Sequence, residues 1–104
     1  MSDVLIKIKR AVLENRYMFS FKARIEMKAD EITEQNVLES IMEARGIAKK
    51  IRSRSPERLH SREYLYVIKS FTWDGLAIYA KGKFLKEGDR EVFYLLISSK
   101  RDLS

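Results

Sequence analysis

The sequence predicts one α+β domain, in which two or three N-terminal helices pack on one face of a four-stranded antiparallel sheet. Three observations support this fold class. The chain has 104 residues, enough for one hydrophobic core but too few for separate cofactor and substrate domains. Apolar residues recur at helical spacing before Gly46, whereas alternating and continuous apolar patterns follow it. Turns of hairpin length then separate the last three expected strands.

Capping residues and apolar spacing indicate the first two helices. The first is expected over residues 2–15, with Ser2 as its N-cap. Its apolar stripe consists of Val4, Leu5, Ile8, Ala11 and Val12. The second is expected over residues 20–29, with Ser20 as its N-cap. Phe21 and Ile25 are expected on its buried side because they are four residues apart.

The third helix is expected over residues 33–45, with Thr33 as its N-cap and Gly46 just beyond its end. Five acidic residues and no basic residue lie between Asp30 and Ala44. We therefore expect this helix to carry an acidic outer face.

Four strands are expected after the helices, over residues 47–53, 63–71, 76–84 and 91–99. Turns at Asp74-Gly75 and at residues 87–90 join the last three. The final strand is nearly all apolar, which is typical of a strand buried on both faces, so we expect it inside the sheet. Residues 52–62 contain the only proline and are expected to form an exposed loop.

The net charge of +6 is concentrated in one segment of the chain. Seven basic residues and one acidic residue lie between Arg45 and Arg62, whereas the rest of the chain is balanced. Such a polarised surface favours a defined anionic partner, with RNA first and an acidic protein second. The alternative is a solvated loop beside tyrosines that fill the core.

Missing residue types and motifs exclude several classes of protein. The chain has no cysteine, which excludes disulfides and thiolate metal sites, and a cytoplasmic location is expected. The longest apolar run is too short to span a bilayer, and no targeting signal is recognisable. Phosphate-binding glycine loops, dinucleotide fingerprints, G-x-S-x-G and H-E-x-x-H are absent, and His60 is the only histidine. We therefore expect neither a bound metal nor a cofactor.

The basic segment is next to expected strands that carry tyrosines. This combination holds single-stranded nucleic acid through phosphate attraction and base stacking. The candidate nucleic-acid-binding residues are Lys49, Lys50, Arg52, Arg54, Arg58, Arg62, Lys81 and Lys83.

RNA cleavage on such a surface needs no metal, because a ribose 2′-hydroxyl attacks its own phosphodiester once a base accepts its proton. Candidates for the base, the charge stabiliser and the proton donor are Arg52, Arg54, Arg58, His60, Lys81, Lys83, and Tyr66 or Tyr79. His60 titrates near neutral pH in its unperturbed state, and an ordinary exposed side chain is the alternative interpretation.

The segment FSFKARIEM at residues 19–27, followed by ITEQNV at residues 32–37, resembles a family of small bacterial domains. The family pattern is F-S-x-H-A-x-x-R-M and then I-S/T-x-x-x-V, and these domains are similar to the RelE and MqsR superfamily of toxins. The resemblance implies an α+β domain that cleaves mRNA, often on the ribosome, and that an antitoxin neutralises. Lys22 stands where the family has histidine, and Glu26 where it has a basic residue. Lys22 would supply positive charge at that position.

Three functions are consistent with these patterns. The first is a RelE/MqsR-like toxin that cleaves RNA without a metal, with candidate catalytic residues Lys22, Arg52, Arg54, His60 and Tyr79. The second is an RNA-binding module that does not cleave its ligand. The third is an adaptor whose basic loop docks an acidic partner, such as an antitoxin-like protein, or the acidic helix of a second copy.

Overall fold

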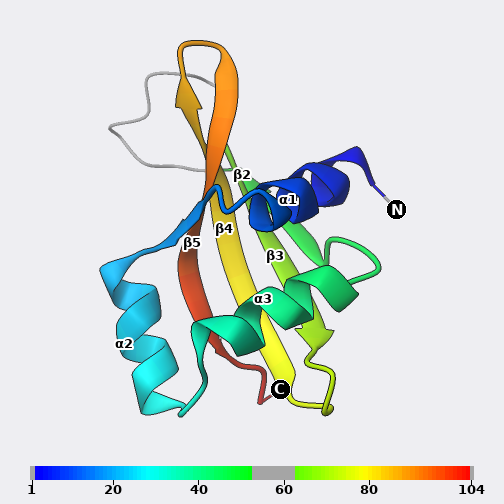
Figure 1. Cartoon of the computed structure of the whole chain (residues 1–104), viewed down its shortest axis with the longest axis vertical. Coiled ribbons are helices and arrows are strands. Elements are labelled where there is room, and N and C mark those ends of the chain that lie inside the picture. The colour runs from blue at the N-terminus through cyan, green and yellow to red at the C-terminus, as the bar shows by residue number, and fades with distance from the viewer. Residues whose placement is uncertain (1, 53–62, 104) are drawn as a thin grey trace.

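A computed structural model describes residues 2–52 and 63–103 of the chain. Within these residues it has three helices and one five-stranded sheet (Figure 1). The helices are α1 (Asp3–Leu13), α2 (Phe21–Ala29) and α3 (Glu34–Glu43). The strands are β1 (Tyr17–Phe19), β2 (Lys49–Arg52), β3 (Tyr64–Phe71), β4 (Ala77–Glu87) and β5 (Arg90–Arg101). The predicted α+β class is therefore confirmed.

Local sequence signals account for α1 and α3. At the start of α1, the Leu5 N–H donates to Ser2 Oγ over 3.2 Å. α3 begins with a capping box, in which Thr33 and Asn36 exchange hydrogen bonds of 3.1 and 2.9 Å. α1 buries four residues of its predicted stripe: Leu5, Ile8, Ala11 and Val12. α3 buries Val37, Ser40 and Ile41.

α2 begins as predicted, but it turns its other side toward the core. Ser20 Oγ accepts the Ala23 N–H over 3.0 Å, which is the expected cap. Ala23 and Met27 are buried, whereas Phe21 is 79% exposed and Ile25 is 53% exposed. The prediction that Phe21 and Ile25 form the buried side is therefore wrong. Both pairs are four residues apart, so spacing alone does not choose between them.

Contacts with β5 determine the orientation of α2. Glu26 Oε1 accepts hydrogen bonds from Ser98 Oγ over 2.8 Å and from the Ser99 N–H over 3.1 Å. One helical turn later, Asp30 Oδ2 accepts the Arg101 N–H over 2.9 Å. These carboxylates accept hydrogen bonds from donors on the edge of β5, beyond the point where β1 ends. Leaving the backbone donors there without a partner would reduce the stability of the fold. Glu26 thus has a structural part in this chain.

The sheet has the strand order β1-β5-β4-β3-β2. The pairs β2–β3, β3–β4 and β4–β5 are antiparallel as predicted, and β5 is internal as predicted. The predicted four-stranded, wholly antiparallel sheet is wrong, because β1 adds a fifth strand parallel to β5, with Tyr17 opposite Tyr94. A three-residue strand is too short to show periodicity, and its partner lies far along the chain.

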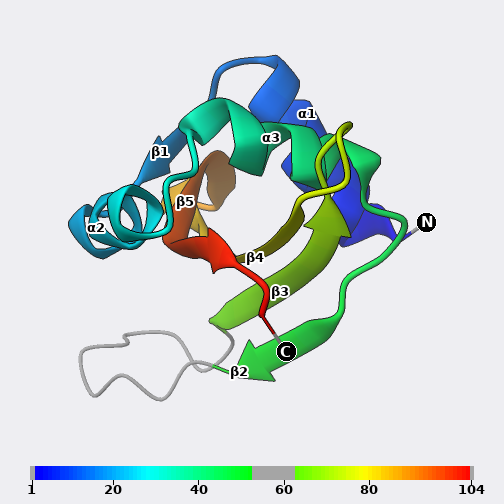
Figure 2. The ribbon, with the colours of Figure 1, turned by 90° about the horizontal axis from the view of Figure 1, so that it is seen from below.

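The two faces of the sheet have different surroundings. One face belongs to the hydrophobic core with the helices and contributes Tyr66, Ile68, Ile78, Ala80, Phe84, Tyr94 and Leu96. Figure 2 shows α1 and α3 on this side of β3 and β4. The alternate residues point to the opposite side, which we call the second face. Its residues include Lys49, Val67, Lys69, Tyr79, Lys81, Lys83 and Lys100.

Tyr94 fills the centre of the core against a glycine on the neighbouring strand. A Cβ atom at Gly82 would lie 2.6 Å from Tyr94 Cε2 and 2.6 Å from the Leu95 carbonyl oxygen. The Tyr94 ring also meets Phe84 edge-to-face, with 5.1 Å between ring centroids. Its hydroxyl is buried and has no hydrogen-bond partner among the residues that the structure describes. Position 82 therefore requires glycine, because the Tyr94 ring and the Leu95 carbonyl leave no room for a Cβ atom.

Candidate nucleic-acid interface

Strand alternation separates the basic residues that the sequence predicted as one group. On β2, Lys49 is opposite Val67 and points to the second face. Lys50 and Arg52 are opposite Tyr66 and Tyr64, so they point to the helix side of the sheet. Lys50 Nζ lies 4.1 Å from the centroid of the Tyr64 ring. Of these three predicted ligands, only Lys49 therefore shares a face with Lys81 and Lys83.

Lysines from four strands gather on the second face in rows set by the strand register. One row crosses three strands as Lys69, Tyr79 and Lys100. The next row, two residues away along the strands, is Lys49, Val67 and Lys81. Lys83 lies two residues further along β4. Because side chains directly opposite each other on paired strands are close neighbours, the rows form one continuous basic surface.

Aromatic rings lie within and beside this basic surface. Lys100 Nζ is 5.1 Å from the centroid of the Tyr79 ring. Phe71 follows Lys69 by two residues on β3 and is 59% exposed. A groove of about 490 Å³ is lined by Lys69, Tyr79, Lys100 and Leu103, among others. Cations and aromatic rings are thus interleaved, as contact with both phosphates and bases requires.

The balance of charge on the second face is positive. Lys83 pairs with Glu63, with 2.6 Å between Nζ and Oε1. Within residues 2–52 and 63–103, no ion pair joins an acidic partner to Lys49, Lys69 or Lys81. Two acidic residues, Asp30 and Asp102, also line the groove, and the Asp30 carboxylate accepts the Arg101 N–H. Most of the lysine charge therefore faces solvent rather than a neutralising partner.

The predicted catalytic residues are placed in three different regions. Tyr79 lies on the second face of β4, Arg52 on the helix side of β2, and Lys22 on the exposed side of α2. Since Arg52 and Tyr79 point to opposite faces of one sheet, the described residues do not bring them together. Arg54 and His60, and the predicted RNA ligands Arg58 and Arg62, lie outside the described residues.

Tyr66, the other tyrosine considered as a proton donor, faces the helices. Burial raises the pKa of the Tyr66 hydroxyl, and the Glu91 carboxylate and Tyr64 raise it further. Burial also raises the pKa of Tyr94, far above the usual range of a phenol. Both hydroxyls therefore stay protonated at neutral pH and resist giving up a proton.

Other ligand chemistry has less support in the described part of the chain. Residues 2–52 and 63–103 contain no cluster of three histidine, cysteine, aspartate or glutamate side chains suited to a metal ion. None of the helices found there has the length and apolar character of a membrane span. The second face is therefore the strongest candidate for a binding surface.

Three residues of the second face, Lys69, Lys100 and Phe71, were not among the sequence-predicted ligands. Lys100 joins the row through its pairing opposite Tyr79, which depends on the register of the β4–β5 hairpin. That register shifts at two irregularities, between Lys81 and Gly82 and between Leu85 and Lys86, so counting back from the turn does not find it.

No family model matches this chain, and no curated protein or solved structure matches it. The second face therefore has to be interpreted from its own chemistry.

Proposed function

We propose that this chain binds single-stranded RNA on the second face of its sheet. The observation that carries the proposal is the row Lys69–Tyr79–Lys100, which sets a ring between two cations from neighbouring strands. Lys49 and Lys81 extend the positive charge along the strands by about 7 Å, the rise of two residues. A strand of RNA can lay phosphates on the lysines and stack bases on Tyr79 and Phe71.

A single strand fits this surface better than a duplex does. Bases in a duplex are stacked on each other and offer no open ring face, whereas unstacked bases stack on aromatic side chains. The lysines lie on the face of a five-stranded sheet, which is broader than the α-helix or two-stranded ribbon that a major groove admits. Affinity without strict sequence readout is the expected consequence, because the contacts are to phosphates and ring faces.

The salt dependence of binding tests this proposal. If Lys49, Lys69, Lys81 and Lys100 each neutralise one phosphate, a plot of log affinity against log salt has a slope of about −3. Fluorescence anisotropy with a labelled single-stranded RNA measures that slope. The variant Lys69→Ala/Lys100→Ala is expected to reduce its magnitude to about half, since two of four contacts are lost. Lys28→Ala, which removes an exposed charge on α2, serves as the control and leaves the slope as it is.

A slope near zero for the wild-type chain would refute RNA binding. If the wild-type chain shows the slope but Lys69→Ala/Lys100→Ala does not reduce it, the RNA interface lies elsewhere on the protein. In that case an acidic protein partner or a second copy becomes the better candidate, and light scattering at low and high salt detects the latter.

RNA cleavage in the manner of RelE and MqsR toxins is the second candidate. The favouring observation is that Tyr79, a possible proton donor, lies between two lysines that can stabilise charge on phosphorus. Labelled RNA incubated with the chain and a chelator would be cut, and Tyr79→Phe would lose cleavage while retaining a ring for binding. If the RNA stays intact after incubation with the wild-type chain, cleavage is refuted and only the binding function remains as a proposal. An acidic antitoxin-like partner remains a prediction that co-purification tests.

A further inference from the structure

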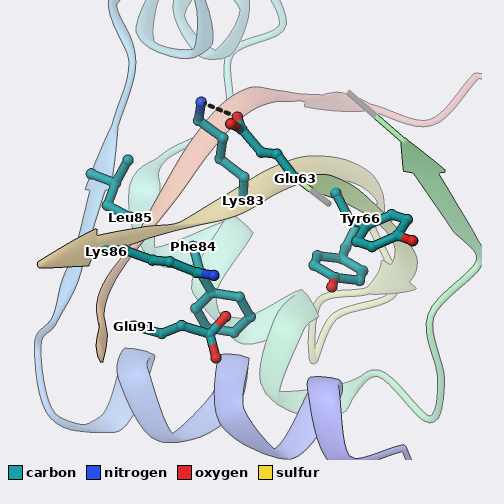
Figure 3. A pocket seen from close by; sticks show the side chains of 8 residues that line it. Glu63, Tyr66, Lys83, Phe84, Leu85, Lys86 and Glu91 are labelled. Atoms are coloured by element: carbon teal, nitrogen blue, oxygen red, sulfur yellow. Dashed lines mark hydrogen bonds and ion pairs between the residues drawn. The ribbon is translucent and has the colours of Figure 1, made fainter. Parts of the chain in front are cut away.

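Two adjoining pockets lie where α1 faces the free end of the β4–β5 hairpin. The aromatic pocket, of about 210 Å³, is lined by Tyr64, Tyr66, Phe84 and Leu85 together with Glu63 and Glu91, among others (Figure 3). The basic pocket, of about 310 Å³, is lined by Lys7, Arg10, Arg16, Arg90, Phe84 and Glu91. Phe84 and Glu91 line both, so the two pockets form one continuous depression.

The aromatic pocket presents rings that are already held in place. Phe84 meets Tyr66 with 6.2 Å between ring centroids and an interplanar angle of 70°. Behind Phe84, the buried Tyr94 ring fixes it from the core side. Figure 3 shows Phe84 on the α1 side of β4 and Lys83 on the opposite side, where it pairs with Glu63. Lys83 and Lys86 also line the pocket, so it adjoins the second face at Lys83, while the Phe84 ring lies on the α1 side.

The basic pocket combines two cations that pair with carboxylates and two that have no acidic partner in the described part of the chain. The Arg16 guanidinium is held by Glu14 at 2.6 and 2.9 Å and by the Val92 carbonyl oxygen at 2.8 Å. Lys7 Nζ lies 3.2 Å from Glu91 Oε1. Arg10 and Arg90 are exposed and form no ion pair with any residue in the described part of the chain.

Four cations thus face a single lining carboxylate, and they come from α1, the turn after it and the start of β5. Guanidinium groups without a partner are well suited to bind phosphate oxygens, since their planar donors match phosphate geometry. Neighbouring rings are suited to hold a base by stacking. Glu91 lies where the two pockets meet, and its carboxylate can accept a hydrogen bond from a ribose hydroxyl or a base N–H.

We propose that this depression binds a nucleoside monophosphate, with the phosphate against Arg10 and Arg90 and the base against Phe84 and Tyr66. The ligand is either a free mononucleotide or the phosphorylated end of a strand. Burial and the nearby Glu91 keep the Tyr66 hydroxyl protonated, so it remains a donor toward the ligand.

Isothermal titration calorimetry with a mononucleotide, the matching nucleoside and inorganic phosphate tests the proposal. The mononucleotide is expected to bind at least about tenfold more tightly than either part alone, because it uses both pockets. Arg10→Ala/Arg90→Ala should weaken mononucleotide binding by about tenfold or more. Lys28→Ala/Arg45→Ala removes the same charge from exposed positions outside both pockets and is the matched control.

Two oligonucleotides that differ only in a 5′-phosphate distinguish the two sources of the ligand. An advantage of the phosphorylated strand that disappears in Arg10→Ala/Arg90→Ala identifies the strand end, and an effect confined to the mononucleotide identifies the free nucleotide. Mononucleotide binding no tighter than that of inorganic phosphate would overturn the proposal. Equal losses in the pocket variant and the control variant would also overturn it.

Discussion

Lys49 and Lys50 are neighbours in the sequence on opposite faces of the sheet, and their separate replacement gives the sharpest test of the proposed interface. Both side chains are exposed on β2 and carry the same charge. Lys49 shares a row with Val67 and Lys81 on the second face, whereas Lys50 lies over the Tyr64 ring on the helix side. Lys49→Ala and Lys50→Ala therefore have equal effects on net charge and unequal effects on the second face.

The size of the difference follows from counterion release. Removing one phosphate contact lowers the magnitude of the salt slope by about 0.7 for a single strand. At about 0.1 M salt this raises Kd roughly fivefold, which is a loss of about 1 kcal/mol in binding free energy. Lys49→Ala is expected to show this loss in both slope and affinity. Lys50→Ala is expected to keep the slope of the wild-type chain, because its charge points away from the RNA.

Anisotropy titrations of the two variants at several salt concentrations, with circular dichroism to verify folding, measure both quantities. If Lys50→Ala weakens binding as much as Lys49→Ala, the assignment of the interface to one face of the sheet is refuted. The basic segment would then act through its overall charge, as the sequence alone suggested.

Three further predictions concern the stability of the fold. Gly82→Ala should lower the free energy of unfolding by about 1–3 kcal/mol in urea titrations because the added methyl group overpacks the core, whereas Gly46→Ala, with nothing near its Cβ, should not. Tyr94→Phe removes a buried hydroxyl without a partner in the described residues and should leave stability unchanged or about 1 kcal/mol higher, so a clear loss would reveal a missing partner. Since burial raises the pKa of Tyr94, the wild-type chain should also lose stability as the pH rises above about 10, and Tyr94→Phe should lose less. Glu26→Ala should cost about 1–3 kcal/mol by leaving donors on the edge of β5 unpaired, and an equal loss in the exposed Glu43→Ala would contradict this account.

Residues close in the sequence determined much of the fold. Ser2, Ser20 and Thr33 cap the three helices as predicted, because a cap bonds to a backbone group only two or three residues away. The apolar pattern of β5 likewise indicated an internal strand without any knowledge of its neighbours. These features can be predicted from the sequence because the residues that determine them lie within one helical turn or one strand.

Features that depend on distant partners were not accessible in this way. Phe21 and Ile25 have the same spacing as Ala23 and Met27, and only the bonds from α2 to β5 select the side that is buried. β1 forms because it pairs with the edge of β5 in the parallel direction. A three-residue segment has no sequence pattern that predicts this pairing.

The basic character of the chain illustrates both kinds of information. The sequence by itself determined that positive charge is concentrated between Arg45 and Arg62 and that the fold class is α+β. Only the tertiary structure decided which cations share a surface: strand alternation divides Lys49 from Lys50, and register adds Lys69 and Lys100. The reason is physical, because the direction of a side chain on a strand changes at every residue and its neighbours are set by hydrogen bonds between strands.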